Sequence, residues 1–353
     1  MQGLFIYCRP GFEGECASEI QEKAAALGIA GFAKAKPDSG YVVFGTYNES
    51  DAATIVQHQP LHTLIFARQW FVLLSLCKEL PVTDRISGLL EALQPLPAPA
   101  TKLALETPDT NEGKMLLTLC RSLERPLSKA LRDEKLLRDS NDQNLSIHIC
   151  FLSTNAAYVG YIPQHNSSPW PMGIPRLKFP KQAPSRSTLK LEEAILYFLT
   201  PEEQEQKLRA GYRAVDLGAC PGGWTWQLVR RSLYVFAIDN GPMSETVMES
   251  GLVEHVRADG FRYQPENRVE WLVCDMVEQP IRIADLVARW LENGWCRYTI
   301  FNLKLPMKKR YQEIKECLGL IEGRLNAANI KYTIQARQLY HDREEVTVYI
   351  ACD

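Results

Sequence analysis

The second half of the chain alternates short apolar runs with longer stretches of helical periodicity. The apolar runs span residues 213–218, 234–239, 271–276 and 298–304. The helical stretches between them include residues 281–293 and 307–329. Because parallel strands are joined by crossover helices, this alternation predicts a doubly wound α/β domain. Two further strand-like runs, 331–337 and 345–350, flank a turn and would make the sheet mixed, though mostly parallel.

The first half has a different rhythm and predicts an α+β region. Strand-like runs occur at 4–8, 41–46, 64–76 and 146–151, and a helical apolar stripe covers 13–27. Six prolines follow, which exclude a helix or a central strand and indicate a linker or a wrapping loop: Pro163, Pro169, Pro171, Pro175, Pro180 and Pro184. We therefore expect an N-terminal region at 1–162, a basic linker at 163–184 and a second domain at 185–353.

Composition excludes several classes of protein. The 353 residues are 46% hydrophobic, which argues against disorder, and no apolar run is long enough for a membrane helix. The first residues lack the pattern of a signal peptide. Ten cysteines without a C-x-x-C pair argue against zinc ribbons and predict a reducing, cytoplasmic location. The net charge of −2 gives no global sign of a polyanionic partner, so any such sign must be local.

The segment Val-Asp-Leu-Gly-Ala-Cys-Pro-Gly-Gly-Trp, residues 215–224, joins an apolar strand to a helix through a glycine- and proline-rich loop. In doubly wound sheets a ligand binds outside the carboxyl ends of the strands, where glycines allow close approach. The spacing is not G-x-G-x-x-G, which weakens a dinucleotide interpretation. Asp216, Asp239 and Asp259 lie at three consecutive strand ends, so they predict a nucleoside-shaped pocket; helix capping is the alternative role of each.

This loop, followed by Asp239-Asn-Gly-Pro, resembles the S-adenosylmethionine site of Rossmann-type 2′-O-ribose methyltransferases. Within that class the chain is similar to the ribosomal RNA large subunit methyltransferase M family over nearly its whole length. The matching motifs include residues 184–193, 274–277, 302–310 and 340–348. The resemblance implies a Rossmann-like methyltransferase domain preceded by a ferredoxin-like part and a THUMP RNA-binding part. It implies S-adenosyl-L-methionine as cofactor, bound by Ser187, Cys220, Pro221, Gly222, Gly223, Asp239, Asp259 and Asp275.

Four charged residues flank the expected pocket and match the family's catalytic Lys-Asp-Lys-Glu tetrad: Lys190, Asp275, Lys304 and Glu345. By resemblance, Lys304 accepts the proton of the 2′-hydroxyl. An ordinary lysine pKa of about 10.4 is too high for a good base at neutral pH. A second lysine would lower the pKa of Lys304 and two carboxylates would raise it, so a positioned cation is the alternative role.

The other members of this set have structural alternatives. Lys190 would be an ordinary solvated helix residue, and Ser187 would cap the helix that begins near residue 189. Glu345 would pair with Arg337 or Arg343 across a hairpin.

Basic residues gather in three stretches where we expect RNA to bind. The spacing of one set predicts a single helix face, with a solvated amphipathic face as the alternative: Arg121, Arg125, Lys129, Arg132, Lys135 and Arg138. The other two sets flank the expected site in sequence: Arg176, Lys178, Lys181 and Arg186, then Lys308, Lys309 and Arg310. His58 and His62 lack an evident third ligand, so we expect no metal site.

The resemblance implies 2′-O-methylation of a cytidine in 23S ribosomal RNA, either naked or in an early assembly particle. Without coiled-coil heptads, a monomer is expected. Three alternatives remain open: a 2′-O-methyltransferase for another RNA, a nicotinamide-dependent oxidoreductase, and a non-catalytic RNA-binding assembly factor. The broken glycine pattern counts against the oxidoreductase, and the complete tetrad counts against the assembly factor. A Lys304→Ala protein that binds cofactor and RNA but transfers no methyl group would support the enzyme.

Overall fold

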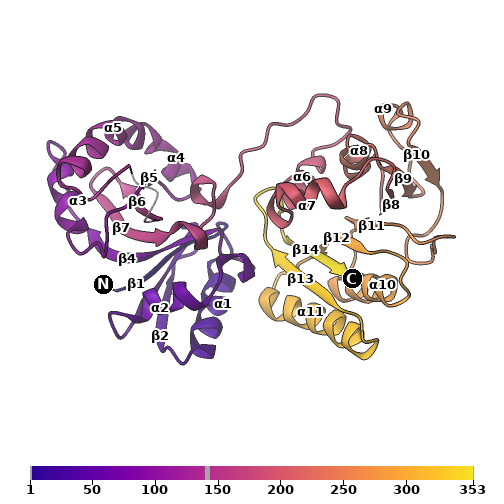
Figure 1. The fold of residues 1–353 in the computed structure, drawn as a ribbon, viewed down its shortest axis with the longest axis horizontal. Helices are drawn as coiled ribbons and strands as arrows, with labels where there is room; N and C mark the ends of the chain where they lie inside the picture. Colours follow the sequence, from indigo (N-terminus) through magenta and orange to yellow (C-terminus); the bar gives the residue numbers. More distant parts are fainter. Residues whose placement is uncertain (1, 140–143, 353) are drawn as a thin grey trace. The chain divides into compact units, whose positions relative to one another are not determined.

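The computed structural model describes residues 2–139 and 144–352, which form two compact units, Met1–Pro175 and Arg176–Asp353 (Figure 1). Residues 1 and 353, the outer ends of the two predicted domains, lie outside the described residues, as do residues 140–143. Each unit contains its own seven-stranded sheet. The boundary between the units falls within the proline-rich segment 163–184.

Unit 1 is built on a sheet with the order β2-β3-β1-β4-β7-β6-β5. Its strands are β1 (Gly3–Tyr7), β2 (Gly31–Ala35), β3 (Tyr41–Thr46), β4 (Gln69–Cys77), β5 (Lys102–Glu106), β6 (Leu145–Ser153) and β7 (Ala156–Pro163). Only β5 and β6 pair in parallel; the other neighbours are antiparallel. The helices are α1 (Glu13–Ala26), α2 (Asp51–His58), α3 (Arg85–Leu93), α4 (Asn111–Met115) and α5 (Leu117–Asp133). The expected strand 64–76 begins later, at Gln69, because a 3-10 turn (Leu61–Thr63) and a loop precede it.

Helix α5 is shorter than the basic periodicity predicts. It ends at Asp133, and Lys135 has a positive φ of 59° that turns the chain out of the helix. The expectation of six cations on one helix face is therefore wrong for Lys135 and Arg138, which follow the helix. Leu127 and Leu131 anchor the opposite face of α5 in the core of this unit.

The first part of the proline-rich segment wraps unit 1 rather than hanging free. The side chain of Asn166 accepts a hydrogen bond from the Leu61 amide (2.6 Å) and donates to the carbonyls of Val56 (2.6 Å) and Gln59 (2.9 Å). Its carbonyl accepts from the Trp70 indole (2.9 Å). These buried bonds fix the segment against α2 and β4.

Unit 2 contains a mixed, mostly parallel sheet, as the strand–helix alternation predicts. The order is β10-β9-β8-β11-β12-β14-β13, with parallel pairing from β10 to β12 and antiparallel pairing of β14 with both neighbours. The strands are β8 (Arg213–Leu217), β9 (Tyr234–Ile238), β10 (Val253–Val256), β11 (Trp271–Cys274), β12 (Tyr298–Lys304), β13 (Tyr332–Arg337) and β14 (Glu345–Cys352). The helices are α6 (Thr188–Phe198), α7 (Pro201–Lys207), α8 (Gly223–Val229), α9 (Glu245–Met248), α10 (Pro280–Glu292) and α11 (Arg310–Ala327).

The core of unit 2 positions the strand ends. Apolar side chains of β8, β11 and β12 pack against α6 and α8, with Val273, Ile300 and Trp224 buried among them. Burial of these side chains fixes the sheet, so the loops that leave the carboxyl ends of β8, β9, β11 and β12 converge at one edge.

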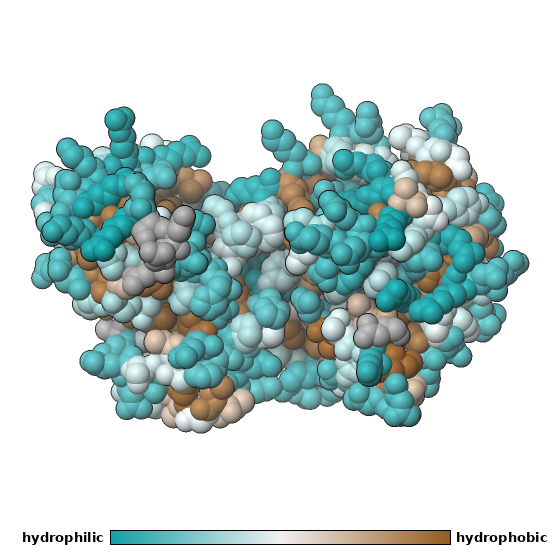
Figure 2. All heavy atoms as spheres, viewed as in Figure 1, coloured by the Kyte–Doolittle hydropathy of each residue, from teal (hydrophilic) through white to brown (hydrophobic). Residues whose placement is uncertain are grey.

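The face of the molecule seen in Figure 2 is largely hydrophilic, with hydrophobic side chains visible between the polar ones. Among residues 2–139 and 144–352, no helix has the length and apolar character needed to cross a bilayer.

Candidate active site

The loop between β8 and α8 has a backbone that depends on glycine. Gly218 has φ +76° and Gly222 has φ +110°, a region that side chains of L residues rarely adopt. A Cβ atom on Gly218 would lie 2.6 Å from Cγ of Met276, in the loop after β11. A side chain at position 218 would therefore clash with Met276.

Asp239, directly after β9, joins two of the converging loops. Its Oδ2 accepts a hydrogen bond from the Cys220 amide (3.0 Å) and its Oδ1 from the Gly241 amide (2.7 Å). Each carboxylate oxygen has a second lone pair, so the partly exposed side chain can still accept from ribose hydroxyls. Asp259 follows β10 with its side chain 51% exposed, and its Oδ1 accepts from the Phe261 amide (2.9 Å).

Asp216 does not belong to the surface of this pocket. It lies within β8, is only 1% exposed, and accepts a hydrogen bond from the Thr225 hydroxyl (2.6 Å). Burial raises the pKa of Asp216 to about 7, and the hydrogen bond from Thr225 only partly offsets that effect. The expectation that three strand-end acids face one nucleoside is therefore wrong for Asp216, which ties β8 to α8.

The four tetrad residues come from separate elements and meet in one cluster. Lys304 ends β12, and Glu345 begins β14 as its direct cross-strand partner. The ammonium of Lys304 donates to Asp275 Oδ1 (2.5 Å) and to Glu345 Oε2. Lys190, in the first turn of α6, contacts Asp275 Oδ2 (3.1 Å) and Glu345 Oε1. Each lysine thus contacts both carboxylates, so Lys190 is not a solvated helix residue and Glu345 does not take the hairpin-pairing role considered from sequence.

The cluster contains two lysines and two carboxylates, and the attraction between them determines which of these groups are charged. Burial disfavours the charge of Lys304, but Asp275 and Glu345 outweigh it, so the pKa of Lys304 is raised above its ordinary value. Burial likewise opposes the charge of Asp275, but Lys304 and Lys190 lower its pKa below the ordinary value. Lys304 is therefore an ammonium at neutral pH in this structure.

Buried polar side chains of β12 and β14 form a chain of hydrogen bonds that ends at Asp275. Asn302 Nδ2 donates to Asp275 Oδ1 (2.9 Å), and Thr347 Oγ1 donates to Asn302 Oδ1 (2.7 Å). Having one proton, the Thr347 hydroxyl cannot also donate to Asp342, which lies 3.0 Å away and accepts from the Leu339 amide (2.9 Å). Burial, then Glu345 and Glu193, raise the pKa of Asp342 well above its ordinary value. Burial and these carboxylates favour the protonated form of Asp342, and a protonated Asp342 would donate to Thr347, so that the chain would run in one direction, toward Asp275.

Sequence reasoning assigned no role to Asn302, Thr347 or Asp342. The available signal was a polar side chain at a fully buried position of an apolar strand, as at Asn302 in β12 and Thr347 in β14. Glu193 was also missed. Its carboxylate accepts from the amides of Tyr340 and His341, both at 2.8 Å, and so ties α6 to the turn before β14.

Ser187 and Gly223 lie next to each other at the starts of α6 and α8. Ser187 makes no capping hydrogen bond from its side chain; its Oγ lies 2.6 Å from the Ser185 hydroxyl. A Cβ on Gly223 would lie 2.1 Å from the Ser187 hydroxyl oxygen. Cys220, whose thiol donates to the Pro242 carbonyl (3.1 Å), and Pro221 complete the loop beside them.

The expected RNA-binding cations in unit 2 are mostly exposed. Lys178, Lys181, Lys308 and Lys309 are open to solvent, and the guanidinium of Arg186 lies over the Phe179 ring. Arg310 is more enclosed and pairs with Glu344 (2.6 Å). In the part of the chain that the structure describes, no group of three His, Cys, Asp or Glu side chains is arranged to hold a metal.

Three family profiles match the chain: the RlmM ferredoxin-like domain at residues 1–71, the N-terminal domain of ribosomal RNA large subunit methyltransferase M at 84–162, and the FtsJ-like methyltransferase at 183–322. The chain is 54% identical to "Ribosomal RNA large subunit methyltransferase M" of Edwardsiella ictaluri, over 99% of this chain and 94% of that protein. It is 52% identical to the protein of that name from Pasteurella multocida, over 99% of each. Among solved structures, TrmN from Thermus thermophilus is 16% identical over the full length of both chains, with a TM-score of 0.38.

Proposed function

Because the chain belongs to the ribosomal RNA large subunit methyltransferase M family, we propose that it methylates the 2′-hydroxyl of a cytidine ribose in 23S ribosomal RNA, using S-adenosyl-L-methionine. The observation that carries the proposal is the Lys190–Asp275–Lys304–Glu345 cluster beside the glycine-rich loop. Binding or assembly alone would not require two lysines and two carboxylates in mutual contact at the strand ends.

The loops at the strand ends fit a nucleoside cofactor. Gly218 and Gly222 give the loop positive φ values that side-chain-bearing residues rarely adopt, and Asp239 offers carboxylate lone pairs to ribose hydroxyls. Asp259 is exposed enough to accept from a base amine. When bound there, S-adenosylmethionine would supply a methyl group on a positively charged sulfur. Ser187, Cys220, Pro221, Gly223 and Asp275 complete the proposed binding set.

The tetrad then serves to orient and deprotonate the ribose hydroxyl. An alcohol is a poor nucleophile and must be aligned and relieved of its proton. As an ammonium, Lys304 can accept that proton only if it gives one of its own away. We place the outgoing proton on Glu345, whose Oε2 Lys304 contacts, so that the hydroxyl proton enters at Nζ while another leaves to the carboxylate. Lys190 and Asp275 hold both groups in position.

The proposed substrate is RNA bound through phosphate contacts of exposed cations that flank the site in sequence, among them Lys178, Lys181, Arg186, Lys308 and Lys309. Arg176 lies over the Tyr340 ring, in the turn before β14, and Arg310 is occupied by Glu344. We propose a monomer acting in the cytoplasm on naked 23S RNA or an early assembly particle.

The test is transfer of a radiolabelled methyl group from S-adenosylmethionine to total RNA of cells lacking this protein. The RNA is fractionated by size and digested to nucleosides. We expect label in large-subunit RNA as 2′-O-methylcytidine, lost with Lys304→Ala. Lys331→Ala, an exposed lysine of the same unit, is the matched control and should transfer normally.

The outcomes separate parts of the proposal. A wild-type rate with Lys304→Ala would refute the proton-transfer mechanism. Label on a base, or in another RNA, would refute the assigned product. Absence of cofactor binding in calorimetry would refute the assignment of the loops after β8 and β9.

A further inference from the structure

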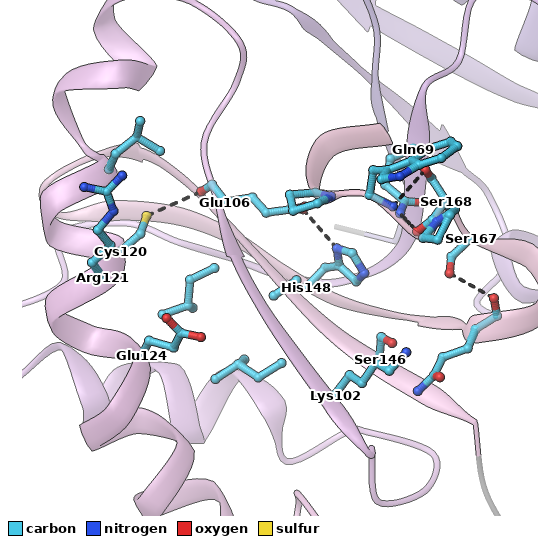
Figure 3. Close-up of a pocket in the computed structure, with 18 residues that line it drawn as sticks. Gln69, Lys102, Glu106, Cys120, Arg121, Glu124, Ser146, His148, Ser167 and Ser168 are labelled. Atoms are coloured by element: carbon cyan, nitrogen blue, oxygen red, sulfur yellow. Dashed lines mark hydrogen bonds and ion pairs between the residues drawn. The ribbon is translucent and has the colours of Figure 1, made fainter. Parts of the chain in front are cut away.

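Unit 1 contains a cavity of about 480 Å³ between β5, α5 and residues 164–171 (Figure 3). This volume lies within the ~300–1,000 Å³ of small-ligand sites. None of the residues that line it belongs to the tetrad or to the loops around Gly218. The function proposed above therefore leaves the cavity without a role.

One wall of the cavity is the backbone of an edge strand. All five residues of β5, Lys102–Glu106, line the cavity. Among the described strands β5 pairs with β6 alone, so its outer edge has N–H and C=O groups without a strand partner. Such an edge offers alternating donors and acceptors to any planar group that lies along it.

The wall across from β5 is a preformed loop that includes Trp170. The Gln69 side chain holds this loop at both backbone polar groups of Ser168, accepting from its amide (3.2 Å) and donating to its carbonyl (3.1 Å). Glu106, which pairs with His148 (3.0 Å), also accepts from the Met172 amide (2.6 Å). Trp170 lines the cavity and is partly exposed, and it is the one tryptophan, tyrosine or phenylalanine among the described residues that line it.

Two exposed cations, Lys102 and Arg121, line the cavity, and further cations continue along α5. Figure 3 shows Arg121 and Glu124 on the α5 side of the cavity, with the loop of Ser167 and Ser168 on the opposite side of His148. Arg121 is exposed, and so are the next cations on the same helix face: Arg125, Lys129 and Arg132. Lys102, at the start of β5, is exposed as well.

We infer that this cavity binds one unpaired nucleotide of the RNA substrate, with its base stacked on Trp170 and its base edge bonded to the backbone of β5. The neighbouring phosphates lie along the exposed face of α5, from Arg121 toward Arg132. The inference rests on the proposed function for the identity of the ligand as RNA. An extended peptide would also suit a strand edge, but the aromatic wall and the row of cations favour a nucleotide.

The first experiment measures binding by fluorescence anisotropy, without cofactor, for a labelled single-stranded RNA of about 16 nucleotides, the upper site size of single-strand-binding modules. Arg121→Glu should weaken binding about tenfold, because it replaces a phosphate contact with repulsion. Lys36→Glu makes the same charge change beyond β2, at the opposite edge of the sheet, and should stay within about twofold of wild type. The same RNA annealed to its complement should bind more weakly, because stacked bases cannot enter the cavity.

The second experiment addresses the base. Trp170→Ala should weaken single-strand binding about fivefold or more, and Trp170→Phe should restore most of it, because a smaller ring still stacks. RNA carrying 5-iodouridine should cross-link to residues 167–171 of the wild-type protein on irradiation.

Equal binding by Arg121→Glu and Lys36→Glu would overturn the inference, as would cross-links confined to other segments or equal affinity for single strand and duplex. Because these assays need no methyl transfer, they can fail while the proposed reaction stands. Conversely, if the protein transfers no methyl group, the RNA-binding assays still test whether the cavity binds a nucleotide.

Discussion

The buried chain from Asp342 to Asp275 makes a sharp prediction about protonation. If Asp342 is neutral and donates to Thr347, an asparagine can replace it, because the amide NH₂ donates to Thr347 and the amide oxygen accepts from Leu339. We therefore expect Asp342→Asn to cost less than about 1 kcal/mol in the free energy of unfolding. Removing the Thr347 hydroxyl, which lies between Asp342 and Asn302, should lower the free energy of unfolding by more than this.

Thr347→Val keeps the shape of the side chain but deletes the hydroxyl. The change removes the hydrogen-bond partner of Asn302 Oδ1 and one partner of the Asp342 carboxyl, and both groups are fully buried. A buried polar group left without its partner costs about 1–3 kcal/mol, so the two together should lower the free energy of unfolding by about 3 kcal/mol or more. Without the Thr347 hydroxyl, the Asn302 side chain loses one of its two hydrogen bonds and positions Asp275 less firmly.

The assay pairs denaturant unfolding, followed by circular dichroism, with the initial rate of methyl transfer at pH 7. Asp342→Asn should resemble wild type in both, whereas Thr347→Val should lose stability and rate together. If Asp342→Asn is as damaging as Thr347→Val, Asp342 is ionised and the direction of the chain is wrong.

Three further predictions concern the same unit. Because the pKa of Asp216 is raised to about 7 from 3.8, its contribution to stability is complete below pH 4 and is lost as the pH rises through 7. The free energy of unfolding of wild type relative to Asp216→Asn should therefore fall by about 4 kcal/mol between pH 4 and 8 in denaturant titrations; a constant difference would contradict the raised pKa. Gly222→Ala should weaken cofactor binding in calorimetry about tenfold or more, since φ +110° strains any side chain. Gly251→Ala, at φ +70° with open space around it, is the control. Equal cofactor affinities of Gly222→Ala and Gly251→Ala would contradict the assignment of the loop after β8 to cofactor binding. If Lys304 passes a proton to Glu345, the transfer rate should be flat from about pH 7 to 9; a rise of about tenfold per pH unit would show that Lys304 reacts as a free amine.

Much of the fold of unit 2 could be predicted because its strands are apolar runs with polar turns between them. The strand expected at 298–304 has those bounds in the structure, and 331–337 and 345–350 form the expected closing strands. What the pattern could not supply was the cross-strand register that sets Lys304 opposite Glu345, which depends on how β14 pairs with β12.

The misses have physical reasons. The end of α5 was misplaced because Lys135 adopts a positive φ, a position where glycine or asparagine is the usual signal. Asp216 was assigned to the pocket because the sequence pattern does not show that β8 continues to Leu217 and that the Asp216 side chain is buried within it. The cavity of unit 1 could not be predicted, since its walls come from segments separated by tens of residues and meet only in the folded sheet.

The tetrad joins α6, the end of β11, the end of β12 and the start of β14, so its four members are far apart in the chain. Contacts between distant residues carry the largest loop-closure cost and form late when a chain folds. Enzymatic activity therefore marks the completion of folding. In a refolding experiment, methyl transfer should return after tryptophan burial, and a kinetic intermediate with a native-like sheet should still be catalytically silent.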